Sequence, residues 1–136
     1  MTYTLRVVGH VESTLTDRDD APKQADEGAP DAWLVIDPDL ADACADLAVG
    51  DELVVITWLH EADRDVQVVH PRSDPTRAPT GVFSTRSPAR PNPLGLHTAR
   101  VLAVDGTRIR VDALEAFDGT PVVDLKPTLA ARRAER

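Results

Sequence analysis

The stretch LHTARVLAVDGTRIRVDAL, residues 96–114, decides the fold class. Two apolar runs flank the pair Asp105-Gly106, and such a pair favours the two-residue turn of a β-hairpin. After the turn, Ile109 and Val111 alternate with charged residues, which predicts a strand with one buried face and one polar face. The stretch therefore predicts an antiparallel hairpin at the centre of a mostly β protein.

Further strand patterns lie on both sides of this hairpin. Runs rich in β-branched and apolar residues predict strands at Thr4–Val11, Ala32–Ile36, Glu52–His60, Val66–His70 and Val122–Pro127. The strand Glu52–His60 is apolar enough to be buried on both faces. Because the strands follow one another through turns, the sequence predicts a small antiparallel β-barrel rather than a parallel sheet with crossover helices.

One short helix is predicted within residues 37–50. Asp37 can cap its start, Pro38 suits its first turn, and Gly50 can end it. A long polar N-terminal loop, Glu12–Asp31, precedes this region, and loops of that length are either functional or disordered. With 136 residues, the chain fits one barrel domain over residues 1–130, followed by a frayed charged tail at 131–136.

Charge is distributed unevenly along the chain. The net charge is −8, with −12 in residues 1–65 and +4 in residues 66–136. A strongly acidic protein does not coat nucleic acid nonspecifically, although a basic face built from the second half could contact phosphate. No apolar run could span a bilayer and no leader is evident, so we expect a cytoplasmic protein. Cys44, the single cysteine, is expected to be a buried apolar residue.

Several familiar site motifs are missing from the sequence. It contains no GxGxxG, no P-loop and no GxSxG, which argues against the usual dinucleotide cradle, phosphate loop and serine nucleophile. The four histidines are widely scattered, and no pair has the helical spacing of metal ligands, so no metal site is expected.

The basic, proline-rich block GVFSTRSPARPNPLGL, residues 81–96, is the strongest candidate for a small-molecule site. Its three prolines fix backbone angles and so lower the entropy cost of binding. Arg86 and Arg90 offer planar guanidinium groups that suit a carboxylate or a phosphate, and Gly95 permits close backbone approach. The same composition is also typical of a surface connector with solvated arginines, and both interpretations stay open at this point.

Taken with LEAFDGTPVVDLKP at residues 114–127, this block resembles the signature of the TrmO-like proteins. The shorter segments VVGHVES, PKQ and WLHEADR follow the order of the same family, so the resemblance covers nearly the whole chain. These proteins are S-adenosylmethionine-dependent methyltransferases, known for methylating N6 of a threonylcarbamoylated adenosine beside the anticodon of tRNA. The resemblance implies a small β-barrel enzyme that acts as a homodimer with its sites near the subunit interface.

The resemblance also implies the site residues. The S-adenosylmethionine contacts would be Pro22, Lys23, Gln24, His60, Glu61, Arg86, Leu96, Asp112, Ala113, Leu114 and Glu115. Arg86 would bind the cofactor carboxylate, Glu61 or Glu115 would face the sulfonium or hold ribose hydroxyls, and backbone groups at residues 113–114 would read adenine. Asn92 and Arg90 would be catalytic, with Asn92 orienting the acceptor amine, and Asp118 and Lys126 would contact the substrate.

Four features depart from the family pattern, and they concern the methyl acceptor more than the cofactor. The family commonly has an aromatic residue at Ala89, a small residue at His97 and a tyrosine at Thr128. Members active on tRNA carry a further C-terminal domain, which we do not expect here because the sequence stops soon after the expected barrel. Two alternatives therefore stay open: a methyltransferase acting on a small molecule, and a module that binds S-adenosylmethionine without turnover.

Overall fold

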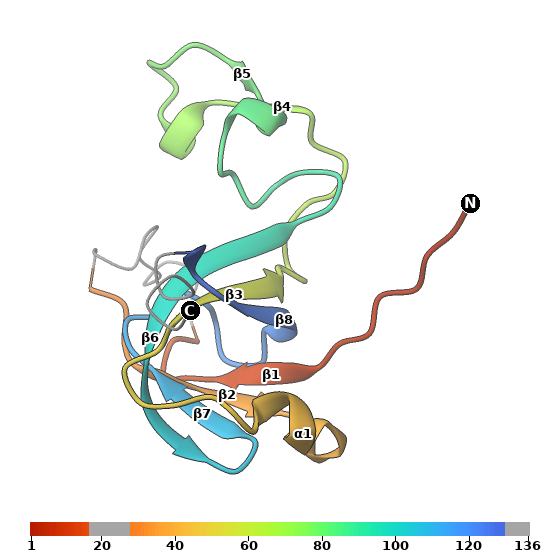
Figure 1. Ribbon diagram of the computed structural model, residues 1–136. Coiled ribbons are helices and arrows are strands. Elements are labelled where there is room, and N and C mark those ends of the chain that lie inside the picture. The colour runs from red at the N-terminus through yellow and green to blue at the C-terminus, as the bar shows by residue number, and fades with distance from the viewer. Residues whose placement is uncertain (17–27, 130–136) are drawn as a thin grey trace.

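Six strands close into an antiparallel barrel in the computed structural model, which describes residues 1–16 and 28–129 (Figure 1). Around the barrel the order is β1-β2-β7-β6-β3-β8, closing back on β1. The strands are β1 (Gly9–Glu12), β2 (Ala32–Ile36), β3 (Glu52–Trp58), β6 (Leu94–Asp105), β7 (Arg108–Val111) and β8 (Pro121–Pro127). The prediction of a mostly β protein built as a small antiparallel barrel with one short helix is confirmed.

The remaining elements lie between the barrel strands. The 3-10 turn η3 (Pro38–Leu40) and the helix α1 (Ala41–Cys44) connect β2 to β3. Between β3 and β6 the chain leaves the barrel in a long excursion, which Figure 1 shows above the barrel in green. This excursion contains the two-stranded pair β4 (Val68–Val69) and β5 (Thr80–Gly81) and the 3-10 turns η4 (Pro71–Ser73) and η5 (Val82–Ser84).

Alternating side chains fill the barrel. Along β3, the side chains of Leu53, Val55 and Thr57 are buried, whereas those between them are half-buried. This alternation corrects the expectation that both faces of this strand are buried, because the side chains on its outer face are only half-buried. The core also includes Val11, Ala32, Leu34, Ile36, Cys44, Ala99, Val101, Ile109, Val111, Leu114, Ala116 and Val122.

The central hairpin forms as predicted, but its turn is shifted by one residue. Asp105 pairs with Arg108, so the turn residues are Gly106 and Thr107 rather than Asp105 and Gly106. Gly106 has a φ of 61°, and a positive φ at the first of two turn residues is typical of the II′ turn, which favours glycine there.

Several element boundaries also differ from the sequence prediction: the strand predicted at Glu52–His60 ends at Trp58, and the one predicted at Val66–His70 covers only Val68–Val69. The first strand begins at Gly9 rather than Thr4, because the backbone bonds to the neighbouring segments begin at Val8, with Val122 and Asp37. Residues 1–7 are exposed and extend away from the barrel (Figure 1). The helix starts as predicted, with Oδ1 of Asp37 accepting a bond from the Asp39 N–H, but it ends at Cys44, before Gly50.

Candidate functional site

The N-terminal half of β6 has one edge that no other strand covers among the described residues. From Leu94 to Arg100 this strand pairs with β3, and β7 pairs with it only from Val101 onward. Alternate residues of an antiparallel strand direct their backbone groups away from the partner strand. The bond from the Leu59 N–H to the Pro93 carbonyl fixes this register, so Leu96, Thr98 and Arg100 direct their N–H and C=O groups to the free edge.

Two of the predicted cofactor residues bind to this free edge. A guanidinium nitrogen of Arg86 donates to the Leu96 carbonyl at 3.0 Å. Farther along the strand, the Arg100 N–H donates to Oδ1 of Asp112 at 2.7 Å, and the Asp112 N–H donates to the Arg100 carbonyl at 3.0 Å. Arg86 and Asp112, 26 positions apart in the sequence, therefore flank the backbone of Thr98.

The segment that follows Asp112 leaves the end of β7 and is bonded to residues 30 and 31. Ala113 has a φ of 39°, which turns the chain, and its N–H donates to Oδ1 of Asp31 at 3.3 Å. The Leu114 N–H donates to the Pro30 carbonyl, and the Leu114 side chain is fully buried in the core. The N–H groups of residues 113 and 114 are thus already bonded within the protein. They are therefore not free to donate to adenine, the role predicted for this part of the backbone.

Glu115 of this segment takes part in a chain of buried polar side chains. Oγ1 of Thr57 is 2.7 Å from Nε2 of His97, and Nδ1 of His97 is 2.6 Å from Oε1 of Glu115. Thr57 is fully buried, His97 is 6% exposed and the Glu115 side chain 15%. The second carboxylate oxygen, Oε2 of Glu115, is also buried, and no donor from the described part of the chain reaches it.

The roles of Thr57 and His97 were not predicted from the sequence. His97 was noted only as a departure from the family pattern. The signal that could have found it is its register, since the alternation along β6 places residue 97 on the inward side with Ala99 and Val101. A histidine on an inward position needs polar partners, and Thr57 is the inward polar residue of the neighbouring strand.

Arg90 organises the proline-rich block from inside. Its guanidinium donates to the carbonyl oxygens of Val82, Thr85 and Ser87, each at 3.0 Å. Its backbone N–H donates to the Asp63 carbonyl. These bonds hold the loop that carries Arg86, so the structure shows a scaffolding role for Arg90, and its predicted catalytic role stays a prediction.

The other predicted catalytic residue, Asn92, is held by Arg64. Arg64 was not among the residues predicted from the sequence. Its guanidinium lies 5.0 Å from the ring centroid of Trp58 and donates through Nε to the Pro91 carbonyl at 2.8 Å. A second nitrogen donates to Oδ1 of Asn92 at 3.2 Å. A carbonyl oxygen has two lone pairs, so this oxygen keeps one for a further donor.

The structure brings some of the remaining predicted residues to this region and leaves others apart. His60 and Glu61 are exposed at the end of β3, beside the start of β6. Lys126 is exposed on the outer face of β8, and Asp118 lies in the turn before β8, where its Oδ1 accepts from the Ser13 N–H. Pro22, Lys23 and Gln24 lie outside the described residues.

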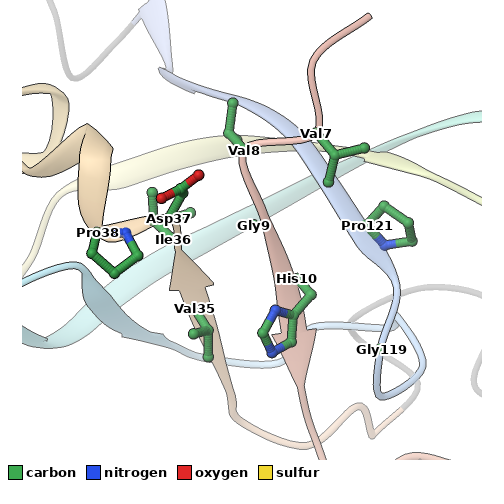
Figure 2. Close-up of a pocket in the computed structure, with 10 residues that line it drawn as sticks. All are labelled: Val7, Val8, Gly9, His10, Val35, Ile36, Asp37, Pro38, Gly119 and Pro121. Atoms are coloured by element: carbon green, nitrogen blue, oxygen red, sulfur yellow. The ribbon is translucent and has the colours of Figure 1, made fainter.

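A groove elsewhere on the barrel contains none of the predicted site residues. It has a volume of about 340 Å³ and is lined by β1, the end of β2 and the turn before β8, as Figure 2 shows. Its polar side chains are His10 and Asp37, and most of its lining is apolar. Its lining includes no arginine or lysine to bind a carboxylate, whereas the edge of β6 has Arg86.

The part of the chain that the structure describes provides no group of three or more His, Cys, Asp or Glu side chains that could hold a metal ion. In the same residues, no helix is both long enough and apolar enough to cross a membrane.

Comparison with known proteins agrees with the resemblance carried by the two motifs. The family model described as the tRNA-methyltransferase O N-terminal domain matches residues 10–132. A protein of Methanothermobacter thermautotrophicus, named a probable S-adenosyl-L-methionine-binding protein, is 42% identical over 127 residues, covering 93% of this chain and 90% of that protein. A protein of the same name from Archaeoglobus fulgidus is 39% identical over 127 residues, and there the match spans only 34% of its length.

A crystal structure of TrmO has the same fold, with a TM-score of 0.76 and 26% identity. The match covers 95% of this chain and 58% of the TrmO chain, so this chain spans little more than half the length of that protein. These findings confirm the family resemblance and, through the relatives named for binding it, S-adenosylmethionine as the cofactor of the family.

Proposed function

Because this chain belongs to the tRNA-methyltransferase O family, we propose that it binds S-adenosylmethionine along the free edge of β6 and transfers its methyl group to N6 of an adenosine in tRNA. The proposed acceptor is the threonylcarbamoylated adenosine beside the anticodon, and the proposed location is the cytoplasm, where tRNA is available. The 42% identity over 93% of the chain to a protein named for binding this cofactor is the observation that carries the proposal.

The free edge of β6 fits the chemistry of this cofactor. Arg86 uses one nitrogen for the Leu96 carbonyl, and a guanidinium has five N–H donors, so donors remain for the cofactor carboxylate. The N–H and C=O of Thr98 can pair with the donor and acceptor edge of adenine. We assign the adenine contact to Thr98 because the N–H groups of Ala113 and Leu114 are already bound.

Bound S-adenosylmethionine supplies a methyl carbon already activated by a sulfonium leaving group. The protein's part is therefore alignment of the acceptor and exclusion of water. Asn92, held by Arg64, accepts a hydrogen bond from the acceptor amine and directs its lone pair at the methyl carbon. The amine can lose its proton after attack, so no strong base is required.

A second copy of this chain is the proposed partner on the outer face of β3 and β6. Leu94 and Leu96 are 42% and 49% exposed there, next to the outward residues of β3. On the adjoining strand β8, Asp124 is aligned with Ile56, and Lys126 lies two residues farther on. A two-fold axis through this face can bring Asp124 opposite Lys126 of the second copy, which gives an apolar surface with self-complementary charges.

The test of the activity uses tRNA from a strain that lacks the N6 methyl group. The protein is incubated with this tRNA and with S-adenosylmethionine carrying a deuterated methyl group, and the nucleosides are analysed by mass spectrometry. We expect the label on the threonylcarbamoylated adenosine, and none on tRNA that lacks the threonylcarbamoyl group. Unlabelled tRNA from a protein that binds the cofactor would contradict the proposed acceptor and favour a small-molecule acceptor.

A further inference from the structure

The chain Thr57–His97–Glu115 places a hydroxyl, an imidazole and a carboxylate in the order found in serine hydrolases. It does not have that function, because Thr57 is fully buried and its hydroxyl is already bonded to Nε2 of His97, whereas the Glu115 side chain is 15% exposed. The Thr57 hydroxyl, both nitrogens of His97 and Oε1 of Glu115 are all bonded within the protein. The remaining acceptor, Oε2 of Glu115, is also buried, and no donor comes to it from residues 1–16 or 28–129.

A buried carboxylate oxygen without a donor is costly, since burial removes its water and nothing replaces it. Native structures seldom leave such an atom unpaired unless a ligand or water completes it. Glu115 belongs to the segment whose first residue, Asp112, is bound to the free edge of β6, and His97 directly follows Leu96, the anchor of Arg86. Glu115 therefore belongs to the segment that starts at the edge where the proposed function places the cofactor.

We propose that His97 is a positioning residue, which fixes the carboxylate of Glu115 so that Oε2 accepts a hydrogen bond from a hydroxyl or amino group of bound S-adenosylmethionine. This inference rests on the proposed function. An ionised carboxylate only accepts hydrogen bonds, so Nδ1 of His97 donates to Oε1. Nε2 is bonded to the Thr57 hydroxyl, which is the donor when the ring is neutral, and both ring nitrogens are used.

The first test reads the imidazole without any ligand. The ¹⁵N shifts of His97 distinguish the neutral ring protonated at Nδ1 from the one protonated at Nε2. We expect Nδ1 to carry the proton. A neutral ring protonated at Nε2 would overturn the inference, because it could not donate to Glu115.

The second test measures the Kd of S-adenosylmethionine by calorimetry. In His97→Ala we expect Kd to rise about tenfold, the effect of losing one well-oriented hydrogen bond to a charged group. In His97→Asn the amide nitrogen replaces Nδ1 as a donor, and Kd should return to within about threefold of the wild type. The matched control is Val101→Ala, another inward residue of β6, which leaves Kd unchanged while also removing buried atoms.

A double-mutant cycle tests whether His97 acts through Glu115. If it does, His97→Ala has no further effect on Kd in a Glu115→Ala background. Additive effects, or wild-type Kd in His97→Ala, would overturn this inference and leave the proposed function intact. Absence of binding by the wild type would instead overturn the proposed function, and with it the role assigned to His97.

Discussion

A Cβ atom on Gly95 would lie 2.5 Å from Oγ1 of Thr57 and 2.7 Å from Nε2 of His97. Gly95 therefore makes room for the bond between these two side chains. We expect Gly95→Ala to lower the free energy of unfolding by about 1–3 kcal/mol, because neither buried partner can move without losing its bond. Urea denaturation measures the loss. Gly81→Ala is the control, since a Cβ there meets no atom within 4 Å, and equal losses in both variants would contradict this account.

The loop 82–87 should loosen when Arg90 is removed. In Arg90→Ala three carbonyl oxygens lose their donor, and we expect amide hydrogen exchange in this loop to become about tenfold faster. Because Arg86 is carried by the same loop, cofactor affinity should fall as well. Arg77→Ala, which removes an exposed ion pair with Asp74, is the control. If Arg90→Ala loses turnover while amide hydrogen exchange in loop 82–87 stays unchanged, Arg90 acts in catalysis and not as a support of the loop.

The outer face of β3 and β6 should determine the oligomeric state. We expect the wild type to sediment at about twice its chain mass of 14.7 kDa, and Leu94→Asp to sediment as a monomer, because the substitution places a charge in an apolar contact. Val68→Asp, at an exposed apolar position in the excursion, should leave the dimer intact. A wild type that sediments as a monomer at all concentrations would contradict the proposed interface.

Alkaline pH should destabilise the protein through Cys44. Burial raises the pKa of the Cys44 thiol, so the unfolded chain releases this proton at a lower pH than the folded protein. The free energy of unfolding therefore falls as pH rises above about 8.5, the ordinary value for a thiol, and stops falling above the folded pKa. Denaturation of wild type and Cys44→Ala from pH 7 to 10 measures this contribution by difference. If the difference in the free energy of unfolding between the two proteins stays constant from pH 7 to 10, Cys44 does not make this contribution.

The sequence predicted the barrel because hydrophobic alternation and turn residues are local signals. The strand Ala32–Ile36 and the hairpin around Gly106 illustrate this. It could not predict where the first strand begins, since residues 4–8 have a strand pattern but pairing depends on β2 and β8. Likewise, motifs identified Arg86 and Glu115, whereas the contact of His97 with Thr57 depends on the register between two strands 40 positions apart.

Two arginines that support the site also make contacts that the sequence could not predict. The sequence gives no role to Arg64 and suggests anion binding or catalysis for Arg90, whereas the bonds that both make depend on which carbonyl oxygens the folded loops bring to them. A guanidinium near prolines suggests anion binding from composition alone. In the folded protein Arg90 binds backbone oxygens, and Arg86 lies at the edge of β6.

The central claim is that S-adenosylmethionine binds along the free edge of β6. An NMR titration of the ¹⁵N-labelled protein with this cofactor tests it most directly, since each backbone amide reports on its own surroundings. We predict the largest shifts at Arg86, at residues 96–98 and at residues 112–115. Shifts confined to the groove of β1 and β2, around Val8 and Ile36, would contradict the claim, because β6 neighbours neither of these strands in the barrel.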